Sequence, residues 1–384
     1  MIEQYLAASR RTRPADARLE EQYATYYGWI ADETTAADQN PALFVTFSSD
    51  RKCELIRIGT TSHLVYDQYL GQSFNRLNRI QFAAHGASQL SQAYASKYVA
   101  ERLLCFGHAG PAAFFAAASH QFERGVKEEG DPFDVPMALN VVRGSLTAVQ
   151  EIFVIAHELA HYRWQRDNEN LREEIRRYAD EFIGHNAQIP KAEEQASTNR
   201  YRETFEHAPP EFLEELFADD FGALIAFRVA ISMGIPAWQA AAGAVLAFKY
   251  LRLFRHLELV ARRIVELTAE SDPKAFKHGL AELKNDIWDE PAGVVGEYQF
   301  REHFIRHRLR QARLTLPSQD ADDEGAISEL IGEYDEKTEF PVVLGLVDRL
   351  EESLTLEVMT ELTEQMGRRP DAVALVDRLT GWAN

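Results

Sequence analysis

Helical spacing of apolar residues extends through most of this chain, whereas strand-like segments are confined to a short stretch near its beginning. That stretch contains three segments that are apolar and partly β-branched or have strand character, at 42–47, 53–58 and 63–70. Turn-forming residues separate these segments. From about residue 72 onward the pattern is helical almost throughout. We therefore expect a mainly α-helical α+β protein with a small antiparallel sheet.

Prolines, glycines and polar stretches divide the helical part. Expected helices cover 87–106, 112–129, 145–166, 168–185, 211–233, 236–268, 272–287 and 296–314. Residues 186–209 are polar and end in a proline pair, so we expect a loop with short helices there. Residues 318–325 are acidic without apolar anchors, which is typical of a linker. The expected organisation is a domain at 1–317, this linker, and a helical segment at 326–384.

Composition excludes several classes of protein. The chain has 384 residues, of which 46% are hydrophobic, so it is long enough and apolar enough to bury a core. Its formal net charge of −19 repels phosphate backbones, which makes nucleic acid an unexpected partner. Two cysteines form no disulfide framework, and the first residues lack the apolar region of a signal peptide. We expect a cytoplasmic globular protein.

The most apolar stretch runs from Val229 to Phe248. A Gly-Ile-Pro sequence at 234–236 interrupts it. We interpret it as the end of one buried helix and the start of another, and we expect no membrane span.

One motif of the helical part carries chemistry. His157, Glu158 and His161 form an HExxH sequence on the expected helix 145–166. Positions four residues apart share one face of a helix, so both imidazoles can point at one metal ion. Glu158 can reach toward a water molecule on that ion. The rest of this helix is apolar enough to be buried on one side.

A second segment can complete the ligand set. Glu215 and Asp219 form an ExxAD pattern on the expected helix 211–233. A catalytic zinc site takes three protein ligands and leaves one position to water, so two histidines and a glutamate suffice. A carboxylate at Asp219 can accept the free N–H of a ligand histidine. Glu211 and Glu214 are alternative third ligands.

These two motifs together resemble those of the gluzincin zinc metallopeptidases. The similarity is greatest to soluble Lit-type phage-exclusion peptidases and more distant to HtpX-like peptidases, and it covers mainly 147–166 and 209–227. The resemblance implies a zincin-like core around one Zn²⁺ ion, with Glu215 as the third ligand. It also implies that Glu158 is the general base of peptide hydrolysis. A role in stress or phage defence follows from the resemblance alone.

Peptidases of this class use a further donor that stabilises the oxyanion of the transition state. It is usually a tyrosine or histidine outside the motif. The candidates here are Tyr298, His303 and His307, on the expected helix 296–314. A basic amphipathic helix with solvated histidines is the alternative interpretation.

The expected function is hydrolysis of peptide bonds in a particular protein target by a zinc-dependent endopeptidase. The strands at 42–70 would offer an edge on which an extended peptide can pair. Two alternatives remain: a metal-dependent hydrolase that does not act on peptides, and a helical binding or regulatory protein with a structural metal. Glu158 argues against the second, because a structural site needs no base. The sequence does not determine the oligomeric state.

Overall fold

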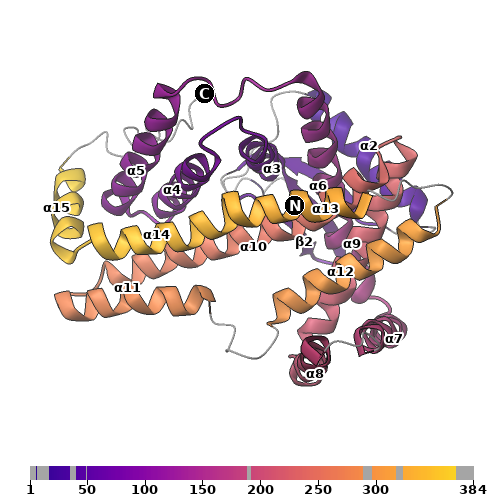
Figure 1. Ribbon diagram of the computed structural model, residues 1–384. Helices are drawn as coiled ribbons and strands as arrows, with labels where there is room; N and C mark the ends of the chain where they lie inside the picture. The colour runs from indigo at the N-terminus through magenta and orange to yellow at the C-terminus, as the bar shows by residue number, and fades with distance from the viewer. Residues whose placement is uncertain are drawn as a thin grey trace. The chain divides into compact units, whose positions relative to one another are not determined.

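The computed structural model describes residue 6 and residues 17–34, 40–48, 50–187, 192–288, 296–316 and 323–368. In these ranges the protein is mainly α-helical, with one small three-stranded sheet (Figure 1). The fold class expected from the sequence is therefore confirmed. A zincin-like core remains a prediction.

The chain divides into two compact units, each formed by three separate stretches: Met1–Asn75, Val141–Lys249 and Glu290–Glu329 in the first, and Arg76–Asn140, Tyr250–Asp289 and Leu330–Asn384 in the second. The first unit holds the sheet and helices α2 (Ala17–Glu33), α7 (Asn168–Ala187), α8 (Ala192–His207), α9 (Glu211–Ser232) and α12 (Glu297–Leu314). Helices α3 (Gln68–Gln81), α6 (Met137–Trp164), α10 (Ala237–Leu267) and α13 (Asp323–Tyr334) have residues in both.

The second unit is helical throughout its described part. It holds α4 (Ala87–Cys105), α5 (Ala109–Glu128), α11 (Pro273–Trp288), the π-helix Asp335–Glu339, α14 (Phe340–Ser353) and α15 (Leu356–Gly367). Helix α4 packs along α5 and α14, and α15 packs on α5. The expected linker overlaps 317–322, which lies outside the described residues. The boundaries expected at 317 and 326 stay predictions.

The sheet is mixed rather than antiparallel, which corrects one expectation. Its order is β1 (Ala42–Thr46), β3 (Thr61–Asp67), β2 (Cys53–Ile58). Strands β2 and β3 form an antiparallel hairpin, whereas β1 pairs with β3 in parallel. Gly59, with φ of 65°, lies in the hairpin turn, where most other residues would be strained.

A buried carboxylate explains why β1 lies beside β3. Asp67, the last residue of β3, accepts hydrogen bonds from the backbone N–H groups of Ser48 and Arg51 at 3.0 and 3.1 Å. These residues belong to the loop between β1 and β2, which Asp67 thus holds across the end of β3. The third strand was expected to reach Leu70. It ends at Asp67 because α3 begins at the next residue.

Two helix predictions also need correction. Helix α6 begins at Met137, eight residues before its expected start, directly after Pro136. Proline is favourable just before or at the first turn of a helix, so it marks this start rather than a break between elements. Residues 192–207, where a loop with short helices was expected, form the single helix α8. Tyr201 of α8 packs its ring against Phe182 and Phe300, and this apolar contact favours the helix.

An aromatic core joins the helices of the first unit. It contains Trp164 of α6, Phe182 of α7, Phe217 of α9 and Phe304 of α12. The interpretation of Val229–Phe248 is confirmed, since α9 ends at Ser232 and α10 begins at Ala237. Of the helices in the described ranges, α6 alone is long and apolar enough to cross a membrane by length and composition, a property that core helices of soluble proteins share.

Helix α6 also carries a buried carboxyl group, Glu151. The Tyr23 hydroxyl donates to Glu151 Oε1 at 2.6 Å, and the Tyr66 hydroxyl donates to the same atom at 3.3 Å. A Cβ atom on Gly71 would lie 1.9 Å from that oxygen, so a larger residue there would displace the Glu151 carboxyl group. Burial raises the pKa of Glu151 from 4.5 to about 7, and the two tyrosine hydrogen bonds oppose the shift.

We expect Glu151→Gln to alter the pH dependence of stability. The folded state binds the proton of the Glu151 carboxyl group more tightly than the unfolded state does. The free energy of unfolding of the wild type therefore falls as pH rises from 4.5 to about 7. The variant should therefore gain about 3 kcal/mol relative to the wild type across this window. Urea unfolding at several pH values measures the difference. A difference that stays constant with pH, as expected for the exposed control Glu128→Gln, would contradict the assignment.

Candidate metal centre

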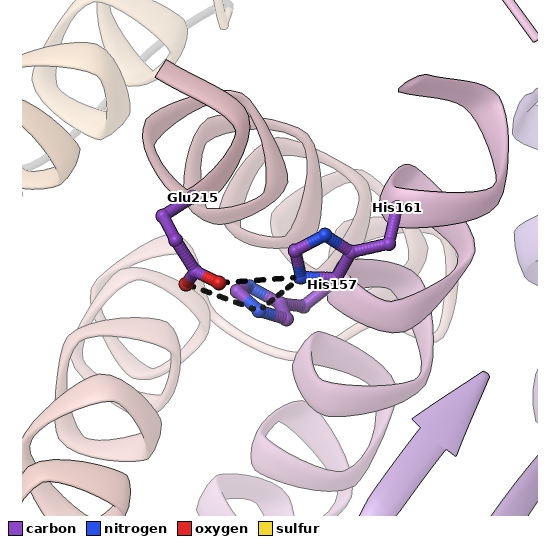
Figure 2. Close-up of side chains that lie close together, drawn as sticks. All are labelled: His157, His161 and Glu215. Carbon is purple, nitrogen blue, oxygen red and sulfur yellow. Dashed lines mark hydrogen bonds and ion pairs between the residues drawn. The ribbon is translucent and has the colours of Figure 1, made fainter. Parts of the chain in front are cut away.

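Two helices supply three side chains that point into one space (Figure 2). His157 and His161 project from the same face of α6, and Glu215 comes from α9. The Nε2 atoms of the two histidines are 3.2 Å apart. Glu215 Oε2 lies 4.0 Å from His157 Nε2, and Glu215 Oε1 lies 3.7 Å from His161 Nε2. The structure thus brings together the three ligands expected from the sequence, and within the described ranges no other group of this kind occurs.

A glycine allows the two helices to approach closely at this point. A Cβ atom on Gly222 of α9 would lie 3.1 Å from the carbonyl oxygen of Phe153 and 3.2 Å from Cβ of His157. Gly222 follows Asp219 by three residues, so it lies on the same side of α9 as the carboxylates. A larger residue there would push α9 away from the histidines.

The outer nitrogens of both histidines face carboxylates. Asp219 Oδ1 lies 3.2 Å from Nδ1 of His157, which is within hydrogen-bonding distance. The angle does not yet allow a hydrogen bond, so the His157 ring would have to rotate to form one. Glu214 Oε1 lies 2.8 Å from Nδ1 of His161. Since an ionised carboxylate only accepts, we assign the proton of each ring to Nδ1, which leaves both Nε2 atoms as acceptors. Two nitrogen lone pairs and the Glu215 carboxylate then converge, an arrangement that a cation stabilises.

The donor set and its spacing fit zinc. Zinc binds histidine nitrogen at about 2.0–2.1 Å in a tetrahedral arrangement, so its ligand atoms lie about 3.3–3.4 Å apart. The observed separations of 3.2, 3.7 and 4.0 Å are within about 0.7 Å of that spacing. Two imidazoles and one carboxylate are also a ligand set of catalytic zinc sites that keep a fourth position open. The Glu215 side chain is 40% exposed, so water can reach the site from that side.

A buried arginine holds the carboxylates of α9 in place. Arg301 of α12 donates from Nε to Asp219 Oδ2 at 2.5 Å and from Nη2 to Glu215 Oε2 at 2.8 Å. Burial opposes its charge, but Asp219 and Glu215 raise the pKa of Arg301 above its usual value. Burial also opposes ionisation of Asp219, yet Arg301 and His157 hold the pKa of Asp219 below its usual value. Arg301 therefore favours the charged form of Asp219 and limits the rotation of both carboxylates.

Glu158 follows His157 on α6 and reaches the edge of the sheet. The backbone N–H of Leu55, in β2, donates to its carboxylate. Burial raises the pKa of Glu158 to about 7; the His161 ring opposes this shift and the Glu215 charge adds to it. A carboxyl group that is partly accessible and has a pKa near neutrality is suited to accept and return a proton.

The structure distinguishes the three glutamates that the sequence left open. Glu211 is exposed, in the first turn of α9. Glu214 faces the outer nitrogen of His161 rather than the converging Nε2 atoms. Glu215 alone of the three has a carboxylate near both Nε2 atoms. Its role as a metal ligand stays a prediction.

The three candidates for oxyanion stabilisation lie apart from this cluster. The centre of the Tyr298 ring lies 5.4 Å from the guanidinium carbon of Arg301, and Arg301 in turn contacts Glu215. His303 Nδ1 is hydrogen-bonded to the hydroxyl of Tyr201, and the His307 ring lies against α7. Among the contacts of the described residues, none joins His303 or His307 to the converging side chains. Their predicted role has no geometric support.

Sequence reasoning missed Arg301. No motif marks it, because its partners lie 82 and 86 residues earlier in the chain. The available signal was an arginine between the apolar residues Phe300 and Phe304 of an amphipathic helix, where a charged side chain needs a buried partner.

Comparison with known proteins identifies no relative of this chain. No family model, curated protein or solved structure shows significant similarity to the chain. The resemblance described above therefore rests on its two short segments.

Proposed function

We propose that the chain is a zinc-dependent endopeptidase with His157, His161 and Glu215 as metal ligands and Glu158 as general base. The observation that carries this proposal is the convergence of the two Nε2 atoms and the Glu215 carboxylate beside Glu158. A structural metal site has four protein ligands and no base next to them. This site offers three ligands, one partly exposed side and a carboxyl group able to exchange protons.

A bound zinc ion would lower the pKa of a water molecule and polarise the scissile carbonyl. The remaining tasks belong to the protein. Glu158 takes the proton of the attacking water on its carboxylate and returns it to the leaving nitrogen, so the peptide bond breaks as water adds across it. The Leu55 N–H holds this carboxylate in position. Arg301 and Asp219 keep Glu215 and His157 oriented.

The edge of β2 offers a place for the substrate backbone. Within the described residues β2 pairs with β3 alone. The backbone N–H of Asp67 donates to the carbonyl oxygen of Lys52. In this register the backbone N–H and C=O groups of the even-numbered residues of β2 therefore face β3. The backbone groups of Leu55 and Arg57 therefore point to the other edge, where Leu55 meets Glu158. An extended peptide pairing along this edge would bring its backbone to the base.

The proposal extends to the location of the protein and to its partners. Cys53 and Cys105 are thiols that no disulfide joins, which accords with a reducing compartment and a cytoplasmic location. The expected partner is a protein or peptide substrate rather than nucleic acid or a membrane. A function in stress or phage defence rests on the resemblance alone.

Zinc content of the purified protein tests the ligand set. We expect about one zinc per chain in the wild type, by plasma mass spectrometry after dialysis, and zinc binding weakened at least about a hundredfold in Glu215→Gln. Glu211→Gln is the matched control, since it removes an exposed carboxylate from the same helix. Zinc kept in full by Glu215→Gln would remove that residue from the site.

Hydrolysis of a denatured protein mixture tests the reaction. We expect new peptide termini that appear with zinc and not after chelation. Zinc bound at full occupancy without any cleavage of peptide bonds would favour a hydrolase of another class. Absence of zinc from the wild type, even after zinc is supplied, would leave a helical binding protein.

A further inference from the structure

A second cavity lies on another side of α12. It has a volume of about 290 Å³ and is bounded by residues of α7, α8, α10, α12 and α13, all within the first unit. Helix α12 contributes three arginines to its wall, Arg306, Arg310 and Arg313. Three histidines also line the cavity: His185, His303 and His307. Basic residues thus gather around one cavity in a protein of net charge −19.

The arginines of the cavity wall share their carboxylate partners with one another or with a lysine. Glu324 of α13 is shared between Arg310 and Arg313, at 2.8 and 2.6 Å. Glu302 is shared between Arg306, at 3.6 Å, and the buried Lys249, at 3.1 Å. In these ion pairs each carboxylate is therefore shared by two cations. The arginines of the cavity wall would attract an anion that enters it.

Arg306 is the cation best placed to receive a ligand. Its ion pair with Glu302 is long, and Lys249 competes for the same carboxylate at a shorter distance. The Arg306 side chain is 36% exposed, so it can be reached from solvent. A guanidinium group presents several N–H donors in a plane, which suits a phosphate or a carboxylate.

Two histidines of the cavity wall favour their neutral form. Burial lowers the pKa of His307, and the neighbouring His185, Arg308 and Arg310 lower it further, whereas Glu181 opposes the shift. Burial likewise lowers the pKa of His303 against the opposing charge of Glu302, and its Nδ1 is hydrogen-bonded to Tyr201. Neutral imidazoles can still donate a hydrogen bond to an anion.

The remaining wall is apolar. It includes Phe182, Ala241, Val245 and Ile327. A volume of about 290 Å³ is at the lower end of that of small-molecule pockets, so it suits a compact organic molecule rather than a polymer. We propose that this cavity binds a small organic anion, with a phosphate or carboxylate group at the arginines and an apolar or aromatic body against Phe182.

Calorimetric titration with phenyl phosphate, benzoate and benzyl alcohol tests this proposal. The full chain is first treated with a chelator, so that binding to a metal in the other site does not contribute. We expect at least one of the two anions to bind and the neutral alcohol to bind at least about tenfold more weakly. The anion that binds more tightly identifies the head group.

Three variants locate the binding. Arg306→Gln should weaken the anion at least about tenfold. Glu324→Gln should tighten it several-fold, because it releases Arg310 and Arg313 from their shared partner. Arg124→Gln, in an exposed pair on α5, is the control and should leave affinity unchanged. Thermal unfolding of each variant confirms that it folds.

A loss of affinity in Arg306→Gln with none in the exposed control Arg124→Gln distinguishes binding in the cavity from general attraction of the anion to arginine. Failure of both anions to bind at millimolar concentration would overturn the proposal. Equal affinity in Arg306→Gln and the wild type would also overturn it. Because zinc is removed before the titration, these results are independent of the proposed peptidase activity.

Discussion

Replacing Glu158 with glutamine should reduce peptide hydrolysis by about a hundredfold to ten-thousandfold while zinc content stays unchanged. Glutamine keeps the size of the side chain and can still accept from the Leu55 N–H through its amide oxygen. It cannot take up the proton of the attacking water. General acid–base groups contribute about 10²–10⁴ to such rates, and this is the part that the variant loses. Initial rates on a denatured protein, with zinc measured on the same sample, check this result.

Glu54→Gln is a suitable control for that experiment. Glu54 lies on β2 next to Leu55, and its charge slightly raises the pKa of Glu158, but it is not a candidate for proton transfer. We expect its activity to stay within about threefold of the wild type. Full activity in Glu158→Gln would exclude Glu158 as the base. Loss of zinc from that variant would assign it a structural part in the site instead.

Replacing Arg301 with glutamine should destabilise the zinc-depleted protein by about 3–5 kcal/mol. The variant leaves the carboxylates of Asp219 and Glu215 without the cation that each now contacts. Removing one partner of a buried ion pair typically costs this much, because the remaining charge is uncompensated. Zinc should raise the free energy of unfolding more in the variant than in the wild type. The ion then compensates Glu215 directly and Asp219 through His157.

Arg308 provides a matched control for this effect. It lies on the same helix and pairs with Asp220 of α9, at 2.8 and 3.2 Å, but Asp220 contacts neither histidine. Arg308→Gln should also lower stability, yet zinc should add no more to it than to the wild type. Urea unfolding with zinc and with a chelator measures both variants. An equal gain in stability from zinc in the two variants would mean that Arg301 connects α9 and α12 without acting on the candidate metal site.

Local features of the site could be predicted from the sequence. The spacing of His157 and His161 determines that both lie on one helix face, because helical geometry depends only on neighbouring residues. The same reasoning placed Asp219 one turn after Glu215. The mainly helical fold with strands near 42–70 also follows from local periodicity.

The identity of the third candidate ligand needed tertiary structure. Glu211, Glu214 and Glu215 are all acidic residues of α9, and their spacing does not say which one faces α6. The rotation of α9 about its axis decides this, and packing against the aromatic core together with the close approach at Gly222 sets that rotation.

The rotation of α12 about its axis likewise explains why His303 and His307, two candidates for oxyanion stabilisation, lie away from the candidate metal centre. Successive residues of a helix are about 100° apart, so His303 and His307 point about 200° and 240° away from Arg301. Arg301 faces α9, and the two histidines therefore face the second cavity. Tyr298, about 60° from Arg301, stays on the same side as the arginine.

The sequence by itself thus determined the secondary structure of the site and the chemical type of its candidate ligands, because both depend on residues close together in the chain. Tertiary structure decided which glutamate joins the histidines, that Arg301 holds it, and that β1 pairs in parallel with β3. These features join residues far apart in sequence. Their geometry depends on how helices and strands pack, which no local pattern specifies.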